Sequence, residues 1–323
     1  MKWFEVLGTR PVAGDIGLEI ETECFKRYDY VPGLGDYWGV HNDGSLRHIG
    51  VEYVFSRPYT IDGAEYKAAL EMFDRQSKAV KFESSTYTSI HVHLNVTREE
   101  VKTIANFLTI YFIVEELLNQ YCGPDRDGNL FCLKTSVAES TFHTAKDLIE
   151  SADAGADFLR HAVSKLNNTQ LKYSALNLYA LRHFGSLEVR THPGSTNVEV
   201  IDRWVHILWA LILYARRHKS PVSIVKSYHD TPDKRSFLLS VFGEYRKYFV
   251  LDNLEERLSD GVFYATLIAN SSQNWANFGS NPPKTVEERK RVKTKNFEGL
   301  TNDQIQDMLN TMAVNPVIPE VDV

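Results

Sequence analysis

The sequence is poor in the features that mark several classes of protein. Its three cysteines, Cys24, Cys122 and Cys132, are too few and too irregularly spaced for a disulfide framework or a zinc knuckle, so we expect core thiols in a reducing compartment. A net charge of −6 leaves no dominant basic surface for nucleic acid. The most apolar helical stretch, Trp204 to Ala215, is too short to cross a bilayer. We therefore expect a cytoplasmic protein that binds neither nucleic acid nor membrane.

The sequence does contain enough apolar material for a large core. Hydrophobic residues make up 43 % of the 323 residues and aromatic residues 12 %. This composition predicts one large domain, or one domain with an appendage. We place the main domain at residues 1–220 and a helical C-terminal extension, packed on it, at residues 221–323.

The spacing of apolar residues predicts both strands and helices. Strand-like alternation occurs at Ile16–Cys24, Gly50–Ser56, Ser89–Val96 and Ser186–His192. Helical spacing occurs at Gly63–Val80, Glu99–Gln120, Ala145–Lys165 and Thr196 to about Arg216. A turn-rich stretch, Cys122–Asn129, interrupts the chain, and Asp43-Gly44 resembles a hairpin turn. We therefore expect an α+β fold, with a curved and mostly antiparallel sheet whose apolar face is covered by helices.

The polar face of each predicted strand is unusual in composition. Because residues two apart share a face of a strand, each strand presents an apolar row opposite a polar row. None of the four segments contains a lysine, although ordinary solvent-facing strands use lysine freely. The polar rows contain instead Glu19, Glu21 and Glu23; Glu52; His91, His93 and Asn95; and Ser186, Glu188, Arg190 and His192.

Two interpretations of these rows remain open. The simpler one is an antiparallel sheet with one solvated face. The other is a metal site, because carboxylates about 7 Å apart repel by roughly 2–3 kcal/mol at an effective dielectric near 20, and a divalent ion offsets that repulsion. Histidines accompanied by many carboxylates and no matching thiolate favour Mg²⁺ or Mn²⁺ over Zn²⁺. The pair Glu188 and Arg190 suits either an internal ion pair or a grip on phosphate oxygens.

Taken in order, these segments resemble the amidoligase family of the glutamine synthetase and glutamate–cysteine ligase superfamily. The resemblance covers roughly residues 17–209 and depends on an ordered set of short motifs rather than on any single one. The motifs are Gly17–Glu21, Asp43–Leu46, Gly50–Glu52, Ser89–His93, Lys172–Asn177, Ser186–Arg190 and Pro193–Thr196.

The resemblance implies a glutamine-synthetase-like catalytic domain with two metal ions. Glu21 and Glu52, with Asp43, would hold one ion near the acceptor carboxylate. Glu52 and Asp43 would thereby contribute to catalysis. A second set would hold the other ion against the phosphates of ATP. That second set is Glu19, His91 and Glu188.

The remaining implied roles concern the nucleotide. Arg190 would act in catalysis and in binding, by stabilising the transferring γ-phosphoryl group. His93 would lie near the phosphates, and Asn177 and Arg182 would contact the nucleotide or the substrate.

The implied reaction is ATP- and Mg²⁺-dependent formation of an amide bond. A small-molecule or peptide carboxylate is phosphorylated to an acyl phosphate, which an amine then attacks. Two alternatives stay open: a phosphotransferase on the same scaffold, such as a guanidino kinase, and a non-catalytic nucleotide-binding or structural module.

Overall fold

The computed structural model describes residues 1–25, 31–46, 49–80, 82–126, 128–130, 132–135, 138–272, 274–276 and 278. The last part of the expected C-terminal extension, residues 279–323, therefore lies outside the described residues. Cys122 and Cys132 are free and buried, as expected of core thiols. The side chain of Cys24 lies outside the description.

One antiparallel sheet organises the described part of the chain. Its six strands lie side by side in the order β2-β3-β1-β4-β6-β5. Every neighbouring pair is antiparallel, which confirms the expected α+β class and sheet type. The strands are β1 (Ile16–Phe25), β2 (Trp38–Asn42), β3 (Ile49–Phe55), β4 (Ser89–Asn95), β5 (Leu176–Asn177) and β6 (Ser186–Pro193).

The apolar row of each strand forms the core, as the alternation predicts. Leu18, Ile20, Ile90 and Val92 are fully buried, and Val189 of β6 joins them. Burying such side chains contributes roughly 1.5–3 kcal/mol each, which fixes which face of each strand turns inward. The polar row is thereby turned to the other face of the sheet.

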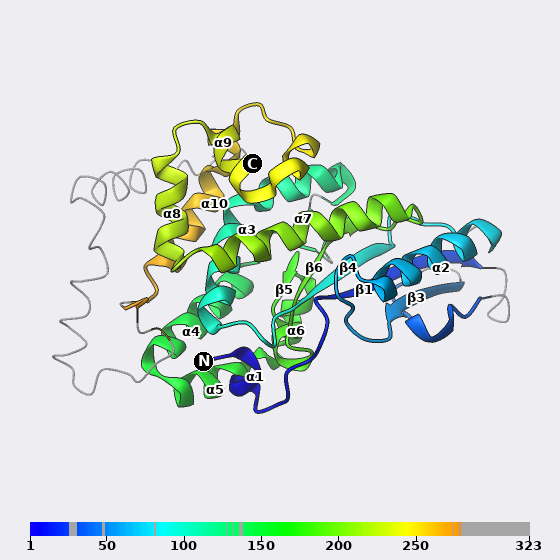
Figure 1. Ribbon diagram of the computed structural model, residues 1–323, viewed down its shortest axis with the longest axis horizontal. Helices are drawn as coiled ribbons and strands as arrows, with labels where there is room; N and C mark the ends of the chain where they lie inside the picture. Colours follow the sequence, from blue (N-terminus) through cyan, green and yellow to red (C-terminus); the bar gives the residue numbers. More distant parts are fainter. Residues whose placement is uncertain are drawn as a thin grey trace, which may run out of the picture.

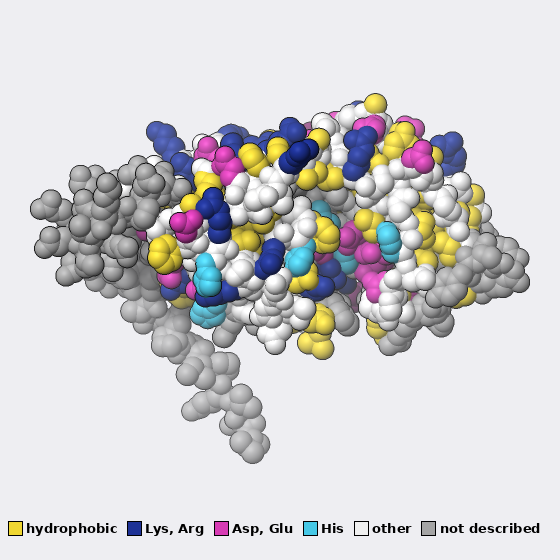
Figure 2. All heavy atoms as spheres, turned by 90° about the horizontal axis from the view of Figure 1, so that it is seen from below, with side chains coloured by type: hydrophobic (Ala, Val, Ile, Leu, Met, Phe, Trp, Pro, Cys, Tyr) yellow, Lys and Arg dark blue, Asp and Glu magenta, His cyan; other side chains and the backbone are white. Residues whose placement is uncertain are grey.

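Helices cover the apolar face (Figure 1). The long helices α3 (Val101–Cys122) and α7 (Val198–Arg217) pack on each other and against β6 and β4 respectively, and α2 (Ala64–Val80) lies beside α7. The short helices α1 (Trp3–Leu7), α5 (Ala156–Ser164) and α6 (Tyr179–His183) lie together near the β5 end of the sheet. Seen from below the view of Figure 1, the molecule has a hollow where acidic side chains gather beside histidine and Lys or Arg side chains (Figure 2).

The helices beyond residue 220 pack on the rest of the molecule. They are α8 (Pro221–Asp230), α9 (Lys234–Phe242) and α10 (Leu254–Ala269). Their buried residues, such as Ile224, Phe237 and Leu258, belong to the same hydrophobic cluster as the sheet. The contact of α10 with α3 is close: a β-carbon on Gly261 would lie 2.2 Å from the carbonyl oxygen of Phe112.

One predicted helix is divided in the structure. The apolar spacing indicated a single helix over Ala145–Lys165, but α4 (Glu139–Ala154) and α5 are separate helices. Gly155 lies between them with φ of 124°, a left-handed value that glycine adopts without steric cost. Periodicity cannot detect this break, because both helices bury apolar residues at helical spacing.

Candidate active site

The register of the sheet brings the polar rows of four strands together. In an antiparallel pair, residues directly opposite each other share a face. Glu19 of β1 lies opposite His91 of β4, and Glu21 of β1 lies opposite Glu52 of β3. The pairs His93–Glu188 and Asn177–Glu188 extend the same face across β6 to β5.

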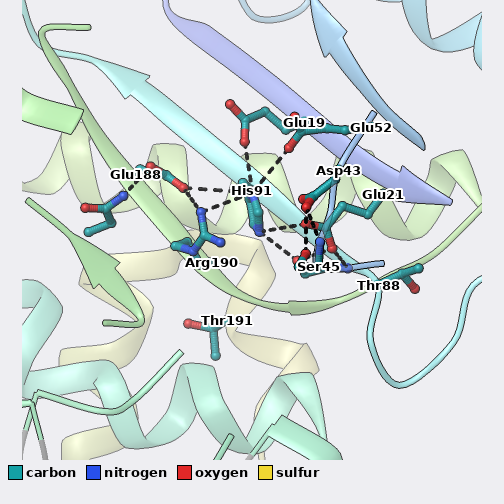
Figure 3. A network of polar contacts seen from close by, with 12 residues as sticks. Glu19, Glu21, Asp43, Ser45, Glu52, Thr88, His91, Glu188, Arg190 and Thr191 are labelled. Carbon is teal, nitrogen blue, oxygen red and sulfur yellow. Dashed lines mark hydrogen bonds and ion pairs between the residues drawn. The ribbon is translucent and has the colours of Figure 1, made fainter. Parts of the chain in front are cut away.

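His91 is the centre of this network (Figure 3). Its ring is buried, its Nδ1 lies 2.9 Å from Glu19 Oε2, and its Nε2 lies 2.6 Å from Ser89 Oγ. The same Nδ1 lies 3.9 Å from both Glu52 Oε1 and Glu188 Oε1. One imidazole therefore contacts or approaches carboxylates from β1, β3 and β6.

His93 makes a parallel set of contacts one step along the strand. Its Nε2 lies 3.0 Å from Glu19 Oε1 and 3.9 Å from Glu188 Oε2, while its Nδ1 lies 3.0 Å from Ser186 Oγ. Gly17 is the residue opposite His93, and a β-carbon there would lie 3.1 Å from that of His93. The glycine thus leaves room for the imidazole.

The third cluster lies toward the β2–β3 hairpin. Glu21 Oε2 accepts hydrogen bonds from the backbone N of Ser89 at 2.6 Å and from its Oγ at 2.7 Å. Asp43, in the turn after β2, accepts from the backbone N and the hydroxyl of Ser45 at 2.7 and 2.8 Å. Together with Glu52, these residues bring three carboxylates into one corner of the site (Figure 3).

Among the described residues, three sets of three side chains could each share an ion. Within each set, the ligand atoms lie within 4.8 Å of one another. Their oxygen and imidazole donors are the types that Mg²⁺ and Mn²⁺ accept. The sets share members, so the site is continuous rather than three separate clusters. They are Glu21–Asp43–Glu52, Glu19–Glu52–His91 and Glu19–His93–Glu188.

Electrostatics shows how crowded the carboxylates are. Burial raises the pKa of Glu52 to about 9, and the carboxylates of Glu19, Glu21 and Asp43 add to the rise. Burial alone would also raise the pKa of Glu19, but His93 and His91 outweigh it and hold that pKa well below its usual value. The same contacts raise the pKa of His93, although its burial opposes this. A divalent ion would relieve the repulsion that Glu52 meets.

Arg190 borders the carboxylates on the β6 side. Its Nη1 donates to Glu188 Oε1 at 2.5 Å and lies 3.4 Å from His91 Nδ1. Asn177 Nδ2 donates to the other oxygen of Glu188 at 2.6 Å. The Nε of Arg190 is buried and has no hydrogen-bond partner within the described ranges. An unpaired buried donor is costly, so this N–H suits an oxygen acceptor supplied by a ligand.

Comparison with known proteins identifies the family. Residues 35–212 match the family described as "Putative amidoligase enzyme", and this stretch exceeds half of the chain. The chain belongs to this amidoligase family. No curated protein matches the sequence. The matched stretch runs from β2 to most of α7. It contains Glu52, His91, His93, Glu188 and Arg190, whereas Glu19 and Glu21 precede it.

Most of the residues predicted from the sequence lie in this site, but Arg182 makes its hydrogen bonds elsewhere. Its Nη1 donates to the backbone carbonyls of Val163 and Ser164, at 3.5 and 2.5 Å, where α5 ends. The family resemblance had implied that Arg182 contacts the nucleotide or the substrate. In the structure its guanidinium instead donates to carbonyl groups in the last turn of α5.

His192 is a clear departure from the alternation in the sequence. Val92 pairs with Val189, but Ile90 pairs with His192, so two residues of β6 lie opposite His91. This β-bulge shifts the alternation by one residue. A histidine that the regular pattern places beside Glu188 and Arg190 is therefore turned to the core face, beside Tyr121 and Trp204.

Two serines of the site were given no role in the sequence-based prediction. Ser89 holds Glu21 and His91, and Ser186 contacts His93. Ser89 precedes His91 by two residues, so strand alternation alone could have placed it on this face. Serine is so common on solvated strands that the pattern gave it no weight.

The part of the chain that the structure describes contains no helix that is long and apolar enough to span a membrane. This agrees with the short apolar stretch in α7.

Proposed function

We propose that this protein is an ATP- and Mg²⁺-dependent carboxylate–amine ligase with a glutamine-synthetase-like catalytic fold, and that it forms an amide through an acyl phosphate. The observation that carries the proposal is the convergence of carboxylates and imidazoles from four strands on one face, bordered by Arg190. Membership of the amidoligase family supports the ligase class.

The chain's own residues divide the work in this proposal. Glu21, Asp43 and Glu52 hold one divalent ion beside the carboxylate substrate. The other ion is held by Glu19, His93 and Glu188, whose ligand atoms lie within 4.8 Å of one another. His93 here takes the place that the family resemblance gave to His91, and His91 lies between the two sets. Bound Mg²⁺ or Mn²⁺ supplies charge neutralisation for the phosphate oxygens.

Arg190 contributes charge stabilisation. With Nη1 bonded to Glu188 and Nε unpaired, its guanidinium presents N–H donors to the γ-phosphoryl oxygens. Fixed donors of this kind stabilise charge that develops during transfer without reorganising. The phosphoryl group passes from ATP to the substrate carboxylate with release of ADP. The amine nitrogen then attacks the acyl carbon, and phosphate leaves.

The decisive experiment is a substrate screen with the purified full chain. ADP release with Mg²⁺ should require a carboxylate and an amine together, and mass spectrometry should detect a new amide with free phosphate. Arg190→Met should lower the rate by about a hundredfold or more, as is typical for loss of a donor to a developing charge. Arg160→Met, at an exposed arginine paired with Asp157, is the matched control and should leave the rate unchanged.

Other outcomes identify the alternatives. A stable phosphorylated acceptor would indicate a phosphotransferase, and MgATP affinity that is equal in wild type and Glu19→Ala would indicate a binding module that does not use the predicted ligands. If ADP release never depends on a carboxylate and an amine across a broad panel, the ligase proposal is wrong.

A further inference from the structure

Arg126 holds the backbone of the bulge in β6. It comes from the turn-rich stretch after α3, in the short helix η3 (Pro124–Arg126), and its side chain is 5 % exposed. Its Nε donates to the carbonyl of Thr191 at 2.8 Å, and its Nη2 donates to the carbonyl of Arg190 at 2.8 Å. These are the two residues of the bulge opposite His91.

The arrangement matches what a bulge requires. The extra residue of a bulge is left out of the regular ladder, so its buried carbonyl needs another donor. A guanidinium has its N–H groups in a rigid fork and can satisfy two adjacent carbonyls at once. The ammonium of lysine has no such fork.

A purely stabilising role explains Arg126 poorly. Within the described ranges its guanidinium makes no ion pair, and burying a charge without a countercharge costs several kcal/mol. The hydrogen bonds that its Nε and Nη2 donate both go to the backbone segment that switches faces. On one side of that segment Arg190 faces the carboxylates, and on the other His192 faces the core.

We propose that Arg126 is a positioning residue that fixes the register of β6 and so sets the direction of Arg190. Without the fork, the bulge can slip by one residue, and a slip of one residue turns side chains to the opposite face. Arg190 then loses its geometry toward Glu188 and His91, and the donors meant for phosphate oxygens point elsewhere. The inference rests on the proposed function, in which Arg190 binds the phosphates of ATP.

The test compares five variants of the full chain with wild type, one of which, Arg126→Ala, serves for chemical rescue. Arg126→Met and Arg126→Lys remove the fork, and the lysine keeps the charge. Arg190→Met gives the reference loss. Arg217→Met is the matched control, since Arg217, the last residue of α7, also donates to two backbone carbonyls, those of Leu213 in α7 and Ser240 in α9. Each protein is measured for MgATP affinity by calorimetry, Mn²⁺ affinity by electron paramagnetic resonance, and amide exchange over residues 189–193 by mass spectrometry.

We expect both Arg126 variants to bind MgATP about tenfold more weakly or worse, as Arg190→Met does, which corresponds to at least about 1.4 kcal/mol. Their Mn²⁺ affinity should stay within about threefold of wild type, because the carboxylates of β1 and β3 are untouched and Glu188 lies in the part of β6 that precedes the bulge. Exchange over residues 189–193 should be about tenfold faster, as expected when a local hydrogen-bonded unit opens more easily. Methylguanidinium added to Arg126→Ala should restore part of the MgATP affinity, which loss of general stability would not explain.

The proposal is overturned if the Arg126 variants bind MgATP as tightly as wild type, or if exchange over residues 189–193 is unchanged. Should Arg126→Met fail to fold, Arg126→Lys and the Arg126→Ala rescue decide the question by the same readings. A wild-type protein that binds no MgATP contradicts the proposed function. In that case amide exchange alone judges Arg126: faster exchange supports its hold on the bulge, and unchanged exchange refutes it.

Discussion

At the scale of single residues, the site is defined by carboxylates that repel one another. Glu52 meets Glu19, Glu21 and Asp43, and its pKa is raised to about 9 by burial and by these neighbours. At neutral pH the metal-free protein therefore carries Glu52 protonated. A bound divalent ion reverses this preference, because it favours the ionised carboxylate.

Replacement of Glu52 by glutamine tests this account. Glutamine resembles the protonated carboxyl in shape, so Glu52→Gln should leave the metal-free protein as stable as wild type or more stable. It should also weaken Mg²⁺ and Mn²⁺ binding by about tenfold or more, since a ligand is lost. Thermal unfolding with and without each ion measures both effects: the ion-induced rise in Tm should shrink in the variant.

The exposed Glu65 provides the control for that comparison. It pairs with Arg57 on the surface, away from the cluster. Glu65→Gln should keep the full ion-induced rise in Tm. A Glu52→Gln protein that is strongly destabilised without metal, yet binds ions as before, would contradict the role of Glu52.

At the scale of elements, β6 serves both faces of the sheet. Up to Arg190 it follows the alternation in the sequence, and beyond the bulge it presents His192 to the aromatic side chains of α3 and α7. Burial lowers the pKa of His192 to about 4, with Arg126 adding to the effect, although a hydrogen bond to the carbonyl of Pro193 opposes it. His192 is therefore a neutral core residue, and its titration reports which face it occupies.

A pH dependence follows from this lowered pKa. In the unfolded chain His192 has its ordinary pKa near 6.5, so between pH 6.5 and 4 the unfolded state binds a proton that the folded state excludes. Stability is thus lost as the pH falls through this window, by on the order of 2 kcal/mol between pH 6.5 and 4.5. His192→Gln removes this contribution, so its unfolding free energy should fall less steeply on acidification.

Urea unfolding at several pH values measures the difference between the two proteins. His161→Gln, at an exposed position of α5, should run parallel to wild type. If the His192→Gln and wild-type curves are also parallel from pH 7 to 4.5, His192 is solvated and the face assigned to it is wrong.

At the scale of the whole molecule, the C-terminal helices share the core of the sheet domain. The long helix α3 lies between the sheet and α10, and Gly261 lets α10 approach within contact of the α3 backbone. Residues beyond Pro221 carry no motif of the family, and the amidoligase match ends at residue 212. Their described helices nevertheless pack on α3 and α7, and these two helices cover the apolar face of the sheet.

Gly261→Ala should have two opposing effects on the stability of the protein. Alanine is favoured over glycine in a helix by about 1 kcal/mol. Against this, the new β-carbon would meet the Phe112 carbonyl oxygen at 2.2 Å and the Ile113 backbone below 3 Å, and overpacking costs about 1–3 kcal/mol or more. Because the atoms in the way are backbone, we expect a net loss of about 1–2 kcal/mol. Urea unfolding measures it.

Ser259→Ala, at an exposed position of the same helix, is the control and should be neutral or slightly stabilising. A Gly261→Ala protein more stable than wild type would show that α10 does not press on α3.

The sequence by itself determined four of the six described strands, all but β2 and β5, and the residue types on their polar faces. Strict alternation is a property of each strand, so the polar row could be assigned without knowing its neighbours. For that reason the antiparallel α+β class and the main site residues could be predicted from the sequence alone. These residues are Glu19, Glu21, Glu52, His91, His93 and Glu188.

Only the tertiary structure decided what those rows do relative to one another. Strand order and register place His91 between carboxylates of three strands, and no local pattern encodes that pairing. The bulge that turns His192 inward depends on Arg126, 65 residues away from Thr191. The use of Arg182 at a helix end is likewise an outcome of packing. In each case the deciding partner lies far away along the chain, because burial and hydrogen-bond satisfaction are settled between elements rather than within them.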